Sequence, residues 1–288
     1  MRNDIPAAAA GTWDLGGDLT VNRIGFGAMQ LAGPGVFGPP ADPSRSIAVL
    51  RRAVELGVNH IDTSDYYGPY VVNELIKEAL HPYPADLVLV TKVGGRRDAA
   101  GGWHSAFTPE EIRQAVYDNL DRLGVPAMHA VNLRRFDEDS IAEQFAVLAE
   151  LRERGLIRHL GLSNVESRHL AECRAIAPVA CVQNLYNVTA REDDPLVDEC
   201  AAAGIAYVPF FPLGGFTPIQ AEALEKVAAR HGATSRQVAL AWLLRRAPNI
   251  LIIPGTSSVA HVDDNVAAGA IVLTDDDLAS LDTPAVPR

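Results

Sequence analysis

Short apolar segments alternate with longer segments of helical character from about residue 24 onward, and this alternation limits the possible folds more than any other feature of the sequence. Eight segments are strand candidates: RIGFGAM, HIDTS, LVLVTKV, HAVNLRR, RHLGLSN, ACVQNLY, IAYVPFF and ILIIPG. Strands that are apolar almost throughout are typical of a parallel sheet covered by helices. Eight strand-helix units therefore predict an α/β fold whose sheet closes into a (β/α)8 TIM barrel.

Helix-end signals support this alternation. Thr108, Pro109 and Glu111 form a capping-box pattern with proline at the first helical position. Ser235 is expected to cap the helix that begins with RQVAL. Four glycines stand where helices should end: Gly57, Gly124, Gly155 and Gly204.

A doubly wound sheet is the alternative fold, and it would favour a glycine fingerprint after the first strand. GPGVFG, at residues 33–38, has the G-x-G-x-x-G spacing, but Pro39 and Pro40 follow where a helix should begin. The barrel is the better prediction. We expect residues 1–11 to be a flexible segment and residues 12–288 to be a single domain, in which WDLGGDLTV forms a β-hairpin that closes the bottom of the barrel.

Charge and composition exclude several classes of partner. The net charge is -11, and the acidic residues are scattered along the helical segments, so neither nucleic acid nor an anionic membrane is expected to bind. No apolar run approaches the roughly 18 residues of a membrane-spanning helix, and the N-terminus lacks a signal-peptide core. We expect a cytoplasmic protein. The three cysteines, Cys173, Cys181 and Cys200, lack CxxC spacing and are expected to be packed thiols, with no metal site.

Side chains that carry chemistry cluster in HIDTSDYYG and LVLVTKV. Asp62 ends the second strand, Tyr67 follows it in the loop, and Lys92 lies at the end of the third strand, so the three should meet at the mouth of the barrel. Lys92, held by Asp62, would lower the pKa of the Tyr67 phenol, which could donate a proton to a carbonyl oxygen. Taken alone, the same residues also fit an ordinary ion pair beside a packed tyrosine.

A wider pattern gives these residues a context. HIDTSDYYG, VTK, GLSNV, VQNLYN and IIPGTSSVAHVDDN occur in the order of the motifs of the aldo-keto reductases, which the sequence resembles over nearly its whole length. The resemblance implies a barrel that binds a nicotinamide dinucleotide across its mouth and reduces aldehydes or ketones. It also implies that Asp62 and Lys92 tune the site and that Tyr67 is the general acid.

The resemblance further implies a set of cofactor-binding residues: Ala28, Met29, Asp62, Ser163, Asn164, Gln183, Phe210, Leu213, Gly214, Gly255, Thr256, Ser257, His261, Asp264 and Asn265. The group at residues 163, 164 and 183 would hydrogen-bond the carboxamide, and Phe210 would stack on the nicotinamide where the family usually has tyrosine. Residues 213 and 214 would follow the pyrophosphate, and residues 264 and 265 would meet the adenine.

Arg134 departs from the family pattern. It stands in LRRFD, at the position of a catalytic histidine. A guanidinium cannot shuttle protons, but it can donate hydrogen bonds to a carbonyl oxygen and stabilise a tyrosinate, so we expect Arg134 to be catalytic. The alternative is that it only pairs with an acid such as Asp137.

The cofactor phosphate site also departs from the pattern, because Gly255 and His261 replace a lysine and an arginine of many members. The backbone amides and hydroxyls of GTSS, at the start of a helix, could still receive a phosphate. We therefore expect NADP(H), with NAD(H) not excluded.

The substrate pocket should be built by loops, chiefly by GGRRDAAGGWHSAF after the third strand. Its expected walls are Tyr66, Trp103, His104 and Phe136, and His104 either supplies an imidazole or is a solvated loop residue. The expected partner is a small-molecule carbonyl compound whose identity the sequence does not give. A monomer is compatible with the sequence. The main alternative function is a dinucleotide-binding regulatory module with weak turnover, whereas a serine hydrolase is disfavoured because Val165 follows Ser163 where glycine is needed, two residues on.

Overall fold

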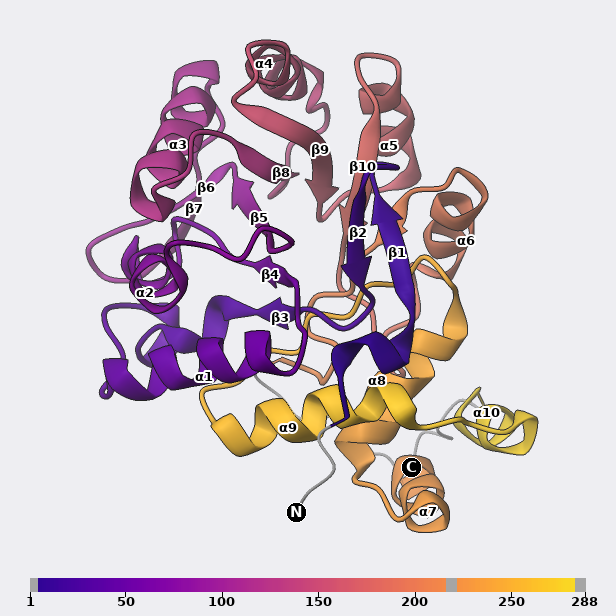
Figure 1. Cartoon of the computed structure of the whole chain (residues 1–288). Coiled ribbons are helices and arrows are strands. Elements are labelled where there is room, and N and C mark those ends of the chain that lie inside the picture. The colour runs from indigo at the N-terminus through magenta and orange to yellow at the C-terminus, as the bar shows by residue number, and fades with distance from the viewer. Residues whose placement is uncertain (1–4, 216–221, 283–288) are drawn as a thin grey trace.

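A barrel of parallel strands forms the centre of the molecule (Figure 1). The structure is a computed structural model and describes residues 5–215 and 222–282. Within these ranges, seven hydrogen-bonded strands follow one another in the order β11-β10-β9-β8-β5-β4-β3. Their bounds are β3 (Phe26–Gly27), β4 (His60–Asp62), β5 (Val88–Val93), β8 (Met128–Arg134), β9 (Ile157–Ser163), β10 (Val179–Gln183) and β11 (Ala206–Tyr207).

The eighth apolar segment, ILIIPG, closes the sheet through single parallel bridges. Ile250 bridges to Tyr207 at one edge of the sheet, and Ile252 bridges to Ile24 at the other edge. Because both edges meet the same segment, the predicted closed barrel is confirmed and the doubly wound alternative is wrong. The GPGVFG segment contains only a short 3-10 turn, Pro34–Val36, and does not open a helix.

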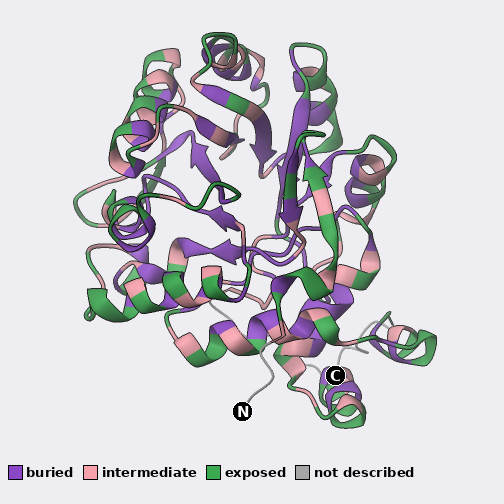
Figure 2. Ribbon diagram, in the orientation of Figure 1, coloured by how far each residue is buried: buried purple, intermediate pink, exposed green. Residues whose placement is uncertain are grey.

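Helices surround the barrel, as Figure 1 shows, and all but the last two connect strands of the barrel in chain order. Their bounds are α1 (Pro43–Glu55), α2 (Val71–Leu80), α3 (Pro109–Leu123), α4 (Ala142–Glu153), α5 (Ser167–Arg174), α6 (Asp194–Ala202), α7 (Glu222–His231), α8 (Ser235–Arg246), α9 (Val259–Ala267) and α10 (Asp275–Asp282). Buried residues line the faces that the helices turn towards the strands, and exposed residues lie on the outside (Figure 2). The main core therefore lies between the sheet and the helices.

The predicted helix ends are confirmed except at one position. Thr108 accepts a hydrogen bond from the Glu111 N–H and closes the expected capping box of α3. The four glycines after α1, α3, α4 and α6 all have a positive φ, between 68° and 83°. The cap of α8, however, is Thr234 and not Ser235, because Thr234 forms the reciprocal box with Gln237.

The N-terminal hairpin closes the amino end of the barrel, as predicted. Its strands, β1 (Thr12–Leu15) and β2 (Leu19–Asn22), pair in antiparallel register around Gly16 and Gly17. Leu15, Leu19 and Val21 join a second core cluster inside the barrel, together with side chains from β5, β8 and β10. The flexible segment over residues 1–11 stays a prediction. Within it, Ala7–Ala10 form a 3-10 helix in which Ala7 is buried.

The long loop after β5 contains a hairpin that the sequence did not indicate. Its strands are β6 (Gly95–Arg97) and β7 (Trp103–Ser105), paired in antiparallel register. Two further 3-10 turns, Ala28–Leu31 and Ala268–Ala270, follow β3 and α9. The hairpin stands at the carboxyl end of the barrel, where it can wall a pocket.

The cysteines and the other candidate metal ligands form no site in the part of the chain that the structure describes. All three cysteines are free and buried, as predicted for packed thiols. No group of three or more His, Cys, Asp or Glu residues is placed to hold a metal ion within the described ranges. No described helix is both long enough and apolar enough to cross a membrane.

Candidate active site

A buried ion pair joins the carboxyl ends of β4 and β5. Lys92 Nζ lies 2.5 Å from Asp62 Oδ1, and it also donates to the Thr63 carbonyl oxygen at 3.0 Å. The other oxygen of Asp62 accepts from Gln183 Nε2, at the end of β10, at 2.8 Å. Three strands thus fix one carboxylate, and the predicted convergence of Asp62 with Lys92 is present.

Tyr67 lies beside this pair. Its ring centroid is 5.1 Å from Lys92 Nζ, and the residue is buried. Burial raises the pKa of the Tyr67 phenol and the charge of Asp62 raises it further, while Arg134 opposes the shift. Our expectation that Lys92 lowers this pKa was wrong, because the lysine charge is matched by Asp62 and the ring is withdrawn from water. Tyr67 therefore stays protonated at neutral pH, as a proton donor must.

Arg134 is the last residue of β8. Its Nη1 donates to Ser163 Oγ at 3.2 Å, and its guanidinium carbon lies 5.3 Å from the Phe210 ring centroid and 5.6 Å from that of Phe136. Among the described residues, no carboxylate forms an ion pair with Arg134. The alternative that it merely pairs with Asp137 is therefore wrong for this structure.

A cavity of about 310 Å³ runs from this cluster across the mouth of the barrel. It is lined by most of the residues that the sequence assigned to the cofactor: Met29, Asp62, Gln183, Phe210, Leu213, Gly255, Thr256, Ser257, His261 and Asn265. Tyr67 lines the same cavity. Residues from the two ends of the chain thus meet around one space, as the motif order predicts.

Some predicted cofactor residues do not line this cavity. They are Ala28, Ser163, Asn164, Gly214 and Asp264. The Asn164 amide instead donates to the Arg135 carbonyl oxygen at 2.9 Å, and Ser163 is engaged by Arg134. Asp264 is exposed, and its carbonyl oxygen accepts from Gln237. Local contacts therefore occupy the side chains of Ser163 and Asn164.

Several cavity residues were not predicted from the sequence, and the polar or aromatic ones among them include Gln30, Phe211 and Arg236. Gln30 belongs to the 3-10 turn after β3, and Phe211 follows the predicted Phe210 with a positive φ of 53°. Arg236 is in the first turn of α8, which is distant in sequence from every motif. Spacing alone gave no signal for it, because only the closed barrel brings the start of α8 to the cavity.

The residues present fit a nicotinamide dinucleotide. Gln183 Oε1 is buried without a hydrogen-bond partner among the described residues, so it offers an acceptor to a carboxamide. The floor is made by backbone in close approach: a Cβ on Gly27 would lie 2.5 Å from the Ile253 carbonyl oxygen. A flat floor without side chains leaves room for an extended ligand.

A second cavity, of about 270 Å³, shares Tyr67 with the first. Most of its wall is aromatic, with Tyr66, Trp103, Phe136, Phe210 and Phe211, and Arg134 and Lys92 supply its positive charge. The edge-to-face contact between Tyr66 and Trp103 has a centroid distance of 5.7 Å.

His104 does not line this second cavity, so its prediction as a pocket wall was wrong. Its Nε2 lies 2.6 Å from Asp98 Oδ2 on the exposed side of the β6–β7 hairpin. The side chain is 46% exposed. The solvated-loop interpretation of His104 fits the structure, because Asp98 holds the ring away from Tyr67.

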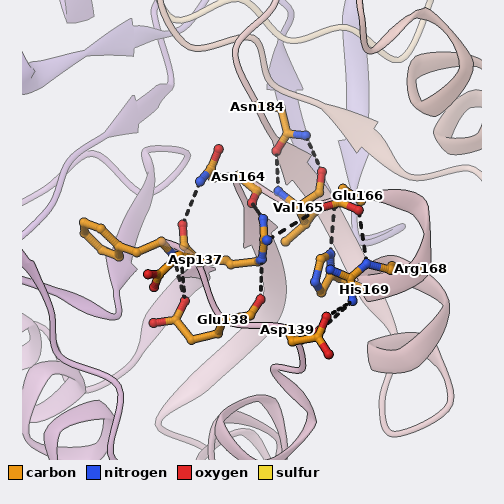
Figure 3. Close-up of polar contacts among 11 residues, drawn as sticks. Asp137, Glu138, Asp139, Asn164, Val165, Glu166, Arg168, His169 and Asn184 are labelled. Carbon is orange, nitrogen blue, oxygen red and sulfur yellow. Dashed lines mark hydrogen bonds and ion pairs between the residues drawn. The ribbon is translucent and has the colours of Figure 1, made fainter.

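Hydrogen bonds hold the loop that carries Phe136. Figure 3 shows how the segment after β8 meets the segment after β9. Arg135 donates to the Glu138 carbonyl oxygen at 2.6 Å and to the Asn164 carbonyl oxygen at 3.4 Å. The Glu138 carboxylate accepts from the Phe136 N–H at 2.8 Å and from Ser105 Oγ, in β7, at 2.5 Å. One carboxylate therefore connects two walls of the second cavity.

Comparisons with known proteins agree with this geometry. A sequence model described as the Aldo/keto reductase family matches residues 23–284. A pyridoxine 4-dehydrogenase of Escherichia coli (strain K12) is 56% identical over 273 residues, covering 92% of this chain and 96% of the relative.

Solved structures show the same fold. A thermostable aldo-keto reductase in complex with epalrestat superposes with a TM-score of 0.82 at 27% identity, covering 94% of this chain and 98% of that chain. An aldo/keto reductase from Klebsiella pneumoniae in complex with NADP and acetate has a TM-score of 0.79 at 26% identity, covering 94% of each chain.

Proposed function

This chain belongs to the aldo/keto reductase family, and from that premise we propose that it is an NADP(H)-dependent oxidoreductase interconverting pyridoxal-type aromatic aldehydes with their alcohols. The observation that carries the proposal is the position of Tyr67 at the junction of two cavities. One cavity contains the predicted cofactor residues, and the other is aromatic and cationic. A proton donor between a dinucleotide site and a substrate site is the arrangement that carbonyl reduction requires.

The chemistry assigns a separate task to each side chain. A reduced nicotinamide, when bound, supplies hydride to the carbonyl carbon. Tyr67 Oη donates a proton to the carbonyl oxygen, and its raised pKa keeps that proton available at neutral pH. The Asp62 to Lys92 pair keeps the phenol oriented and places a positive charge near the tyrosinate that remains after proton transfer.

Arg134 suits a substrate with two adjacent oxygens. Pyridoxal carries a phenolic oxygen next to its aldehyde, and a guanidinium presents several N–H donors in a fixed plane. Arg134 can therefore donate to the carbonyl oxygen and to the neighbouring phenolate at the same time. The aromatic walls of the second cavity offer faces and edges to the pyridine ring.

Two relatives support the proposal. The Escherichia coli relative is a pyridoxine 4-dehydrogenase by name, and it spans almost the same length as this chain. The Klebsiella pneumoniae structure holds NADP, and it shares the fold at 26% identity. The name of the first relative supports the reaction class, and the ligand of the second supports the cofactor.

The test is steady-state oxidation of NADPH with pyridoxal, compared with an apolar aliphatic aldehyde of similar size. Tyr67→Phe removes the proton donor and should lower kcat by at least ~10²-fold, with little change in NADPH affinity. Tyr70→Phe is the matched control, because Tyr70 lies outside both cavities and should keep normal turnover. The proposal fails if Tyr67→Phe is fully active, and its substrate class fails if the aliphatic aldehyde is reduced more efficiently than pyridoxal.

A further inference from the structure

We infer that Arg236 binds the 2′-phosphate of NADP(H) and selects this cofactor over NAD(H). The inference rests on the proposed use of a nicotinamide dinucleotide and adds a residue to that site. Arg236 lies in the first turn of α8 and lines the large cavity. It is a cation in the cofactor cavity that neither the motif pattern nor the relatives' names assign.

The guanidinium of Arg236 is available to a ligand. Within residues 5–215 and 222–282, Arg236 is exposed and has neither an ion pair nor a hydrogen bond from its side chain. Arg134, which lines the second cavity, by contrast donates a hydrogen bond to Ser163 Oγ. An exposed, unpaired guanidinium at the edge of a cavity is suited to a doubly charged phosphate, which accepts two parallel N–H bonds.

The neighbours of Arg236 provide further phosphate donors. Ser257, Ser258 and His261 line the same cavity as Arg236. The Thr256 hydroxyl accepts from the Ser258 N–H at 3.0 Å and lies 3.3 Å from His261 Nδ1, so this turn is held in a fixed shape. The hydroxyls of Ser257 and Ser258 have no hydrogen-bond partner within the described residues.

Steric contacts explain why the charge comes from α8. Gly255 occupies the position where many family members carry a lysine, but a Cβ there would lie 2.5 Å from the Gly27 carbonyl oxygen. That oxygen belongs to β3, so a side chain at residue 255 would force the barrel backbone to move. A cation at residue 255 is therefore excluded in this backbone, and Arg236 supplies one from the adjacent helix.

The first turn of α8 is hydrogen-bonded to α9, the helix that follows Thr256, Ser257 and Ser258. Thr234 and Gln237 close the capping box around Arg236, and the Gln237 amide also donates to the Asp264 carbonyl oxygen in α9 at 3.0 Å. This hydrogen bond links the first turn of α8, which carries Arg236, to α9. A positioned cation loses less entropy on binding than one on a mobile loop.

The competing role for Arg236 is stacking on the adenine ring, which NADP(H) and NAD(H) share. The experiment measures the dissociation constants of NADPH and NADH by quenching of protein fluorescence. Arg236→Ala should raise the dissociation constant of NADPH about tenfold, near the lower range for an exposed charge-assisted contact. The dissociation constant of NADH should change by less than about twofold. Arg236→Lys should retain part of the preference because it keeps the charge and loses the planar fork.

Arg245→Ala is the matched control. Arg245 is on the same helix, carries the same charge, lies outside the cavity and is 4.0 Å from Asp275. This variant should change neither affinity. If Arg236→Ala weakens NADPH and NADH equally, the residue stacks on adenine and the inference is overturned; if it weakens neither, the residue does not contact the cofactor.

Fragments separate this inference from the proposed function. Adenosine 2′,5′-bisphosphate should compete with NADPH on wild type about tenfold better than AMP does, and this advantage should disappear in Arg236→Ala. If wild type binds neither dinucleotide, the proposed function itself fails. If wild type binds NADPH but both fragments compete equally, only the role of Arg236 fails.

Discussion

At the scale of single residues, Arg134 lies where it can act on a carbonyl oxygen. It ends β8, lines the second cavity with Tyr67, and contacts the Phe136 and Phe210 rings. Its charge also opposes the rise in the pKa of Tyr67 that burial causes. We propose that this guanidinium does part of the work that the family usually assigns to a histidine, by donating hydrogen bonds without transferring protons.

Arg134→Met tests that role. The variant removes a fixed cation beside the developing oxyanion and should lower kcat by ~10²-fold, near the lower range for losing one electrostatic donor. NADPH affinity should change little. Arg134→His should keep activity at acidic pH and lose it as pH rises through the ordinary histidine pKa of about 6.5. Pyridoxal reduction by Arg134→Met at the wild-type rate, with saturating NADPH, would show that the guanidinium does not reach the carbonyl.

The buried carboxyl of Asp65 should make the stability of the fold depend on pH. Burial raises the pKa of this carboxyl to about 7, although hydrogen bonds from Ser64, from the Tyr66 backbone and from Asn119 oppose the shift. Because the unfolded chain ionises from near 3.8, the unfolded state loses its proton first, so the free energy of unfolding should fall as pH rises from about 4 to about 7. The loss from this one group is up to roughly 4 kcal/mol.

Asp65→Asn should remove that loss. Urea unfolding followed between pH 4 and pH 8 should show a flatter profile for the variant and a higher free energy of unfolding above about pH 7. Asp86→Asn, an exposed substitution, is the control and should leave the wild-type slope unchanged. A variant at Asp65 whose profile is parallel to wild type would refute the assignment.

Residue-scale predictions from the sequence were accurate where a motif carries several groups at fixed spacing. Asp62, Tyr67 and Lys92 meet because parallel strands bring their carboxyl ends to one edge. The local partner of His104 is an example of what spacing cannot reveal. The cofactor role of Asn164 stays a prediction, since its amide nitrogen is held by the Arg135 carbonyl oxygen.

At the scale of elements, the strands and helices follow the hydrophobic pattern closely, with differences at their ends. ILIIPG is apolar like a strand, yet it forms only single bridges to its neighbours. One bridge to β11 and one to Ile24, just before β3, are enough to close the barrel. The N-cap of α8 is Thr234 in place of the predicted Ser235, because only Thr234 has a Gln three residues later. The β6–β7 hairpin was not predicted, because its pairing depends on turn geometry within a glycine-rich loop.

The hairpin and the loop after β8 are joined through Glu138. Its carboxylate accepts from Ser105 Oγ and from the backbone N–H groups of Phe136 and Asp137. Although burial alone would raise it, the pKa of Glu138 is lowered by these hydrogen bonds. Glu138 does not line either cavity, so its effect on substrate is that of a positioning residue acting through Phe136 and Trp103.

Glu138→Gln should raise KM for pyridoxal by roughly threefold to tenfold while changing kcat and NADPH affinity little, because the amide cannot accept all three hydrogen bonds. Glu172→Gln is the control: Glu172 accepts from Ser140 Oγ and the Ile141 N–H, and it also lies outside the cavities. That variant should keep the wild-type KM. An equal rise in KM for both variants would mean that general loosening, and not the position of Phe136, is responsible.

At the scale of the whole molecule, the carboxyl end of the barrel forms the site and the amino end is closed. The carboxyl end gathers Asp62, Tyr67 and Arg134 around the cavities, while the amino end is closed by the β1–β2 hairpin. The hairpin is fixed there by Asp18, which lies 2.8 Å from Arg158 Nη2 at the start of β9. Closure of this end leaves the site end free to open to ligands.

This division predicts that the hairpin affects stability without affecting chemistry. Leu15 is 1% exposed and packs inside the barrel with Val88, Val90 and Leu251. Leu15→Ala should lower the free energy of unfolding by about 2 to 5 kcal/mol, as expected for a cavity left by a buried leucine, while kcat/KM of the folded enzyme stays at the wild-type value. Val272→Ala, at a side chain 81% exposed, should change stability by less than about 0.5 kcal/mol. Urea unfolding and pyridoxal reduction are measured on the same preparations. A fall in kcat/KM without loss of stability would contradict this prediction and show that the closed end of the barrel is coupled to the site. Packing inside the barrel would then transmit a change at Leu15 to the ends of β4 and β5.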